Sequence, residues 1–327
     1  MYYNNNGMIK FVDFKKHVEA GVFDPVYAAI GDDAFLISSA VKMLERLVDM
    51  PEINSACYGD SSDIDAMILQ YGQLPMMSGK KLMKCEMENM PPKTLERFLK
   101  YVHHSPNPDT LVIFTAQKLP ACLAANAGKY TVVDCARLDE KMTVKWIAAQ
   151  AAKRGASISV DAAHLLANYC LCNLTRIEVE FEKLCEVAYG RMIEESDVAA
   201  YVVPDGDYKI YELSDALAKK DVKRTYAVYD SIIVNTAPVA VIGTLYGHFR
   251  RLLYAAVSKC DRELLARYLR VKPYAMEMAA RQAKTYTPKR LKKIVDRLSQ
   301  IDADFKSGRI NDRVALDTFI AETLCAA

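Results

Sequence analysis

Short, predominantly apolar runs alternate with helical patterns in the first third of the chain. The apolar runs lie at 25–30, 56–58, 82–85, 111–115 and 130–134. Runs of this length and composition predict buried strands. Between them, Asp32 or Asp33 can cap a first helix, Ser61 or Ser62 a second, and Pro92 opens a third. This alternation predicts a largely parallel sheet with helices on both faces.

The first of these helices is expected to run to about residue 47. Its apolar side is predicted to carry four residues, which are Phe35, Val41, Leu44 and Leu47.

The strand signals stop after about residue 139, and the remaining patterns are helical. Gly155 is a plausible C′ residue of one helix, and Ser159 caps the next. The segment 204–207 (Pro-Asp-Gly-Asp) predicts a turn and a second boundary. Pro238 and the Thr287-Pro288 pair each open a later helix. We therefore expect an α/β domain over 1–139, a small helical domain over 140–207 and a larger helical domain over 208–327.

The composition is that of a globular protein, with 51% hydrophobic and 26% charged residues. It excludes wholesale disorder, which needs low hydrophobicity and high net charge. No run approaches the 18 apolar residues of a membrane span, and the N-terminus lacks the pattern of a signal peptide. The nine cysteines form no Cys-x-x-Cys pair, so we expect reduced cytoplasmic thiols. A metal site at Cys170 and Cys172 is the less favoured alternative, because no second pair follows.

The net charge of +2 conceals an asymmetry along the chain. Residues 1–207 carry 21 basic and 28 acidic residues, a net charge of −7, whereas residues 208–327 carry 22 and 13, a net charge of +9. An acidic half joined to a basic half indicates different partners for the two parts.

An α/β domain invites a nucleotide-binding hypothesis, but the phosphate cradle is missing from the sequence. A P-loop needs Gly-x-x-x-x-Gly-Lys-Ser/Thr between the first strand and helix. Here that position holds Gly31-Asp32-Asp33-Ala34, where two acids would repel phosphates. No Gly-x-Gly-x-x-Gly, Gly-x-Ser-x-Gly or His-Glu-x-x-His motif is present either. We expect no intrinsic catalysis, no cofactor and no metal; an active ATPase is a third, less favoured reading.

Six segments, in their order along the chain, resemble one known family. They are 27–37, 74–82 (Leu-Pro-Met-Met-Ser-Gly-Lys-Lys-Leu), 111–116, 146–162, 174–184 and 211–217. The chain is similar in these segments to the delta subunit of bacterial DNA polymerase III, the clamp-loader subunit that opens the sliding clamp. The resemblance covers nearly the whole chain.

The resemblance implies an AAA+-type fold in three parts, namely an α/β domain, a helical lid and a helical collar that joins subunits. It implies a chain that does not hydrolyse ATP but belongs to the DNA polymerase III holoenzyme, a nucleotidyltransferase. The implied partners are the beta sliding clamp, the gamma/tau and delta-prime subunits, and primed DNA through the assembled complex. The implied location is the bacterial cytoplasm, at the replisome and nucleoid, with no membrane partner.

In this family, a hydrophobic pair before the third strand inserts into a pocket on the clamp. The matching pair here is Met76 and Met77, with Leu74 and Pro75 beside them. Two apolar side chains on an exposed turn are costly unless a partner buries them. The alternative is that both methionines pack inward against the sheet. The family more often has an aromatic residue at the second position, where this chain has Met77.

The runner-up function is a DNA-binding protein or nuclease that uses the basic C-terminal region. Residues 281–297 contain seven basic residues and one acid, and such a face could neutralise phosphates. It could equally be the solvated side of a helix. The candidate DNA contacts are Lys289, Arg290, Lys293, Lys306 and Arg309.

Overall fold

A computed structural model describes residues 8–59, 63–88, 90–121, 130–234, 236–271 and 273–325. The chain forms two compact units, Met1–Lys153 with Cys172–Glu186 and Arg154–Leu171 with Val187–Ala327, and each is described by itself. The three-part division at 139 and 207 stays a prediction. In the part of the chain just given, no helix is long and apolar enough to cross a membrane.

The first unit contains a six-stranded parallel sheet with the order β1-β6-β2-β5-β4-β3. Its strands are β1 (Met8–Lys10), β2 (Val26–Ile30), β3 (Ser55–Tyr58), β4 (Lys81–Glu86), β5 (Thr110–Ala116) and β6 (Thr131–Asp134). The five predicted strands and their parallel pairing are confirmed. Sequence reasoning missed β1, because three residues are too short to show a period. It pairs with β6 in the register Met8↔Val132.

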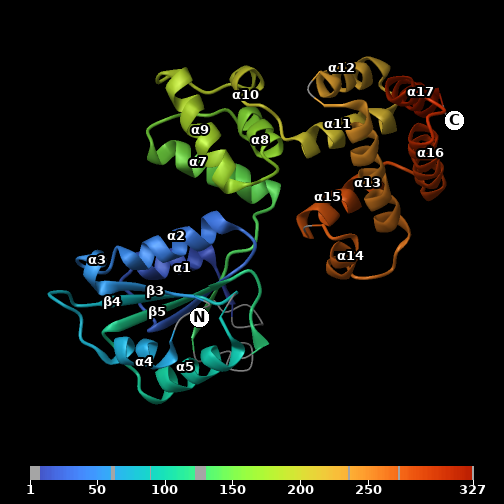
Figure 1. Cartoon of the computed structure of the whole chain (residues 1–327). Helices are drawn as coiled ribbons and strands as arrows, with labels where there is room; N and C mark the ends of the chain where they lie inside the picture. The colour runs from blue at the N-terminus through green and yellow to red at the C-terminus, as the bar shows by residue number, and fades with distance from the viewer. Residues whose placement is uncertain are drawn as a thin grey trace. The chain divides into compact units, whose positions relative to one another are not determined.

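Helices cover both faces of this sheet, as the alternating pattern predicted (Figure 1). The helices of this unit are α1 (Phe11–Glu19), α2 (Ala34–Glu45), α3 (Pro51–Asn54), α4 (Ile64–Gly72), α5 (Pro92–His104), α7 (Glu140–Lys153) and most of α9 (Leu174–Ala188). One face carries α1 and α2, and the other carries α4 and α5. Beneath α4 and α5, the rings of Tyr71, Phe98 and Phe114 meet edge-on with centroids 6.1 and 6.3 Å apart. This apolar layer fixes the two helices on the sheet.

The start of α2 is fixed by Asp33, whose carboxylate accepts hydrogen bonds from the Phe35 and Leu36 N–H groups at 3.0 and 3.1 Å. Asp33 is therefore the N-cap. The second predicted cap, at Ser61 or Ser62, lies outside the described residues; α4 begins at Ile64 behind the cap Asp63.

The predicted apolar side of α2 was partly wrong. The fully buried line is Leu36, Ala40 and Leu44, at spacings of four residues. Phe35, predicted to face the core, is only half-buried, and its ring lies edge-on to that of Trp146 at 5.2 Å. The small Ala40 takes a core position, which the periodicity of large apolar residues does not reveal.

The second unit is helical. Its helices are α8 (Val160–Tyr169), α10 (Glu195–Tyr201), α11 (Gly206–Lys219), α12 (Val222–Ile233), α13 (Pro238–Val257), α14 (Arg262–Leu269), α15 (Pro273–Ala283), α16 (Pro288–Lys306) and α17 (Asp312–Cys325). The predicted caps Ser159 and Thr287 are confirmed, and Pro238 opens α13. The turn predicted at 204–207 is shorter than expected, because Asp205 already caps α11.

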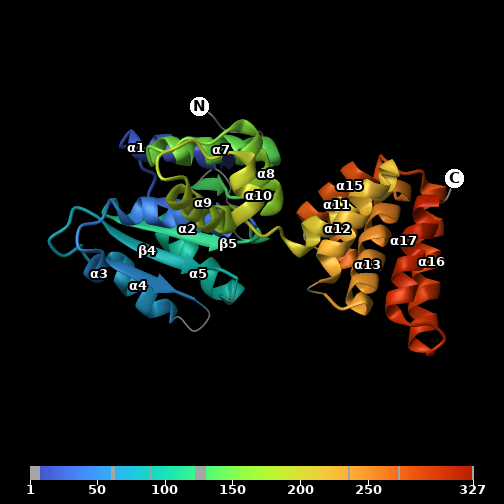
Figure 2. The same cartoon turned by 90° about the horizontal axis from the view of Figure 1, so that it is seen from above.

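Helix α13 lies at the centre of the helices α11 to α17 and contacts α15, α16 and α17 (Figure 2). Phe249 on α13 meets the rings of Tyr286 and Phe319 with centroids 5.8 and 6.4 Å apart. The neighbouring His248 is buried, with its Nε2 2.9 Å from Gln282 Oε1. Burial lowers the pKa of His248 to about 3, so a neutral imidazole is part of this core.

Candidate functional site

The turn between α4 and β4 holds the four residues singled out for clamp binding. Leu74, Met76 and Met77 are exposed, with 77%, 61% and 88% of their surface accessible, and Pro75 is half-buried. The alternative in which both methionines pack against the sheet is therefore wrong. Apolar side chains so exposed, and adjacent, indicate a surface that a partner covers.

A buried asparagine holds this turn from the neighbouring segment. Asn54, only 5% exposed, accepts a hydrogen bond from the Met76 N–H at 2.8 Å and donates one to the Met76 carbonyl oxygen at 2.9 Å. Its Nδ2 also donates to the Asp49 carbonyl oxygen at 2.8 Å. One side-chain amide thus satisfies three backbone groups and joins segment 49–54 to the turn.

Ser78 forms a second tie between the same two segments. Its hydroxyl accepts a hydrogen bond from the Asp49 N–H at 3.1 Å and donates one to the Lys80 carbonyl oxygen at 2.7 Å. Between the two ties, Met77 adopts a left-handed backbone with φ of +53°. That conformation is unfavourable for a side-chain-bearing residue. The hydrogen bonds on both sides hold it in place.

The same segment adds two exposed apolar residues that sequence reasoning missed. Met50 is 37% exposed and Ile53 55% exposed. Met50 is the N-cap of α3, and Ile53 lies within this helix next to its last residue, Asn54. We call the set Met50, Ile53, Leu74, Met76 and Met77 the apolar turn surface. Its halves are separated along the chain, so only the fold shows that they belong together.

The place where a nucleotide cradle would lie is occupied by the chain itself. A Cβ on Gly31 would lie 2.0 Å from the Cys135 carbonyl carbon, so the backbone after β6 closes on this glycine. The Asp33 carboxylate accepts from two N–H groups in the first turn of α2, those of Phe35 and Leu36, and Asp32 accepts from the Arg137 N–H at 2.9 Å. Burial raises the pKa of Asp33. These contacts use the groups with which a P-loop would bind phosphates.

Metal ligation has no geometric support in the described ranges. There, no group of three or more His, Cys, Asp or Glu side chains is arranged to hold an ion. Cys170 and Cys172 are both buried.

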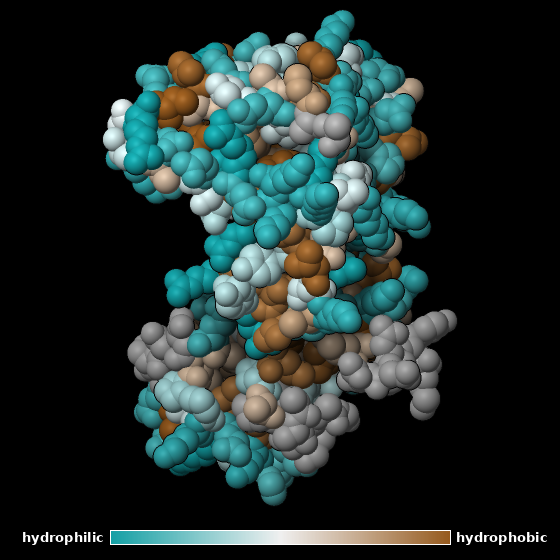
Figure 3. Space-filling model, turned by 90° about the vertical axis from the view of Figure 1, so that its right-hand side faces the viewer, coloured by the Kyte–Doolittle hydropathy of each residue, from teal (hydrophilic) through white to brown (hydrophobic). Residues whose placement is uncertain are grey.

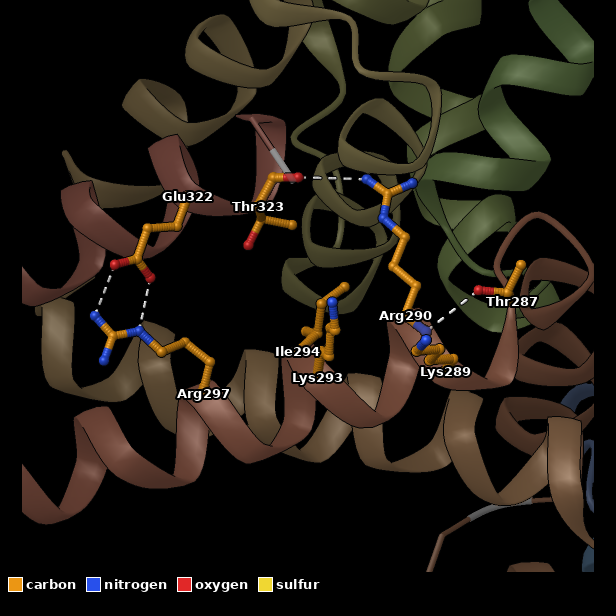
Figure 4. A pocket seen from close by; sticks show the side chains of 8 residues that line it. All are labelled: Thr287, Lys289, Arg290, Lys293, Ile294, Arg297, Glu322 and Thr323. Atoms are coloured by element: carbon orange, nitrogen blue, oxygen red, sulfur yellow. Dashed lines mark hydrogen bonds and ion pairs between the residues drawn. The ribbon is translucent and has the colours of Figure 1, made fainter. Parts of the chain in front are cut away.

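The basic face of α16 lines a pocket of about 310 Å³ with the end of α17 (Figure 4). Lys289 and Lys293 are exposed there. Arg297 is engaged by Glu322 through bonds of 2.6 and 2.9 Å. In the upper part of Figure 3, hydrophilic residues cover most of the described surface and hydrophobic ones are scattered. That pattern suits a solvated or charge-binding face.

Arg290, singled out with these lysines, lies in a different environment. Its guanidinium donates to the carbonyl oxygens of Leu217 and Ala218 at 2.9 and 3.2 Å, and lies 5.3 Å from the Tyr286 ring centroid. It also donates to the Thr323 carbonyl oxygen at 3.4 Å. These contacts join the ends of α11 and α17 to α16, so the charge of Arg290 serves the fold of this unit.

The two remaining basic candidates lie at the far end of α16. Lys306 is exposed and pairs with Asp302 at 2.5 Å, and Arg309 pairs with Asp304 at 3.2 Å. Exposed pairs of this kind are weak. The structure does not bring these residues together with Lys289 and Lys293, which lie near the start of the same 19-residue helix.

Comparison with known proteins shows what this chain is similar to. Residues 207–323 match the family model described as DNA polymerase III delta subunit, C-terminal domain. The resemblance to the delta-subunit family is confirmed. Over 343 aligned positions the chain is 23% identical to DNA polymerase III subunit delta of Bacillus subtilis, covering 95% of this chain and 96% of that protein.

The fold agrees with that match. The solved structure of the Bacillus subtilis DNA clamp loader delta protein superposes with a TM-score of 0.71 at 21% identity, over 96% of this chain and 99% of that one. The predicted fold class, a parallel α/β part followed by an all-helical part, is thereby confirmed.

Proposed function

We propose that this chain acts as the delta subunit of a bacterial clamp loader, binding the ring-shaped beta sliding clamp through the apolar turn surface. One observation carries the proposal: Met76 and Met77 stand exposed on an anchored turn in a chain similar to clamp-loader delta subunits. The turn lies at the position that the resemblance implied for clamp contact.

The physical chemistry of the turn fits this role. Each methionine contributes roughly 1.5–3 kcal/mol when a partner buries it fully, and its flexible thioether suits an adaptable pocket. The backbone is held before binding, so little ordering entropy is lost on association. Opening the ring then requires that the chain bind the open clamp more tightly than the closed one.

The chain supplies no ATP chemistry in this proposal. Asp33 and the backbone around Gly31 fill the cradle position, so ATP-driven steps belong to the gamma/tau and delta-prime partners. The helices after residue 207 would join those subunits, and the assembled complex would meet primed DNA in the cytoplasm. Purified full-length chain should show no ATP turnover above a buffer control.

Clamp binding is tested with the full chain and the beta sliding clamp of the same bacterium, immobilised on a sensor surface. We expect the Met76→Ala, Met77→Ala double variant to lose at least about tenfold in affinity, since a loss of 1.4 kcal/mol is already tenfold. Met192→Ala is the matched control, because Met192 is also exposed but lies outside the turn. Equal binding by the double variant and the parent would refute the site.

A second candidate function is direct DNA contact through α16. It is favoured by the exposed Lys289 and Lys293 beside a pocket lined by charged side chains. Phosphate contacts make affinity strongly salt-dependent. The test is binding of a primed duplex by the full chain at increasing salt. An affinity that does not change with salt would remove this candidate.

A further inference from the structure

We infer that Asn54 is a positioning residue for clamp docking, which holds Met76 and Met77 in their binding orientation. The inference rests on the proposed function and adds a residue that itself contacts no clamp. Asn54 is buried, whereas the methionines it holds are exposed.

The argument begins with the chemistry of the side chain. Asn54 uses its oxygen as acceptor for the Met76 N–H and its nitrogen as donor to the carbonyl oxygens of Met76 and Asp49. A carboxylate has no donor, and an aliphatic side chain has neither group. A carboxamide fits this arrangement, with its hydrogen-bonding groups used on backbone atoms.

The second step is the position of Asn54 in the fold. It directly precedes β3, which begins at Ser55, and the turn directly precedes β4. These strands are paired neighbours with Ser55 opposite Leu82. Asn54 therefore joins the segment that leads into β3 to the segment that leads into β4. Because these strands are part of the sheet, the contact fixes the orientation of the turn relative to the sheet.

The third step separates this role from ordinary stabilisation. The side-chain partners of Asn54 lie in surface segments, at Asp49 and Met76, and not in the apolar layers of the sheet. Ser78 ties the turn to Asp49 independently. Losing the Asn54 amide should thus free Met76 and the left-handed Met77 while the domain remains folded.

The test compares Asn54→Ala with the parent chain by clamp affinity and by methyl NMR of ¹³C-methionine-labelled protein. We expect an affinity loss of about tenfold, as for removal of preorganisation from a binding loop. We also expect the Met76 and Met77 methyl signals to move toward random-coil positions. The signals of Met67 and Met83, both buried in the same unit, should not move.

Asn173→Ala is the matched control, since it removes an asparagine whose oxygen accepts from a backbone N–H, that of Arg176, away from the turn. It should leave clamp affinity and the Met76 and Met77 signals unchanged. Asn54→Asp keeps the acceptor but loses the donor, so we expect an intermediate loss. It also decides the question should Asn54→Ala not fold: parent-like binding by Asn54→Asp would then overturn the inference.

The outcomes separate the two proposals. Parent-like affinity of Asn54→Ala, together with weak binding by the methionine double variant, overturns the positioning role and leaves the docking site standing. An affinity loss without movement of the Met76 and Met77 signals also overturns it. If both variants bind like the parent, the docking site and the positioning role fall together.

Discussion

Asn54 and Met76 are joined by two hydrogen bonds, one to each polar group of the Met76 backbone. The buried residue is thus paired with an exposed one across 22 positions of sequence. An unsupported loop would lose much conformational entropy when a partner ordered it. The Asn54 hydrogen bonds already order the turn in the folded chain. Less conformational entropy is therefore lost when a partner binds the apolar turn surface.

Ile53 should contribute to clamp binding, because it is 55% exposed and adjoins the residue that holds Met76. Ile53→Ser should weaken clamp affinity about three- to tenfold, since burying part of an isoleucine contributes roughly 1 kcal/mol. Its exposure predicts little change in thermal stability. Val222→Ser, at 56% exposure elsewhere in the chain, is the control. Clamp affinity on a sensor surface compares the Ile53→Ser and Val222→Ser variants. Equal affinities would show that the site does not extend beyond the turn to Ile53.

Gly31→Ala should destabilise the α/β unit. The added Cβ would lie 2.0 Å from the Cys135 carbonyl carbon and 2.4 Å from the Ala136 nitrogen, and backbone atoms cannot move aside cheaply. Overpacking of this kind costs about 1–3 kcal/mol or more. Gly72→Ala, near which no atom lies within 4 Å of the new Cβ, should be neutral or slightly stabilising. Urea unfolding of both variants compares them directly, and equal midpoints would contradict the close approach.

The buried His248 makes the helical unit sensitive to acid. Because its pKa is about 3 when folded and about 6.5 when unfolded, the unfolded state binds the extra proton between these values. Stability should therefore fall as pH decreases from 6.5 toward 3, by up to about 1.4 kcal/mol per pH unit for this group.

His248→Phe removes that titration. It lowers stability at neutral pH, because Gln282 loses its partner, but its unfolding free energy should vary less with pH between 6.5 and 4 than that of the parent. Chemical unfolding at several pH values measures the difference. Parallel pH curves for the two proteins would show that His248 is not the responsible group.

Substitution of Arg290 should lower stability, whereas substitution of the lysines beside it should mainly affect DNA affinity. Arg290→Ala leaves the carbonyl oxygens of Leu217 and Ala218 without this donor, which should cost about 1–3 kcal/mol. Lys289→Ala with Lys293→Ala should change stability by less than about 0.5 kcal/mol per site. If the second candidate function holds, the lysine pair also lowers the salt slope of DNA binding by up to about 2. Melting curves and salt titrations provide both readouts.

Much of the α/β unit followed from local pattern. The predominantly apolar runs marked five of its strands, and Asp33 and Pro92 marked two helix starts. These features depend on neighbours within a few residues, so they can be recognised from the sequence alone. The burial of Ala40 in place of Phe35 was not predicted, because the spacing of large apolar residues gives no signal for a buried alanine.

The candidate site was predictable only in part. The Leu-Pro-Met-Met segment could be singled out, but its exposure could not, because periodicity allowed an inward alternative. Asn54 gave no signal, since its role arises from a contact with Met76 that the strand pairing of β3 and β4 creates. Arg290 was grouped with the lysines predicted to contact DNA, because charge alone does not reveal which guanidinium is already bound to helix ends.

The position of β6 in the sheet means that the sheet cannot be completed during synthesis until β6 has emerged from the ribosome. This strand lies between β1 and β2, whose residues are synthesised long before it, with Met8 opposite Val132 and Tyr27 opposite Thr131. Until β6 has left the exit tunnel, β1 lacks its neighbour and β2 has one open side. Pairing so distant in sequence delays folding and leaves apolar edges uncovered. The nascent α/β unit thus keeps apolar strand edges uncovered until β6 is inserted between β1 and β2.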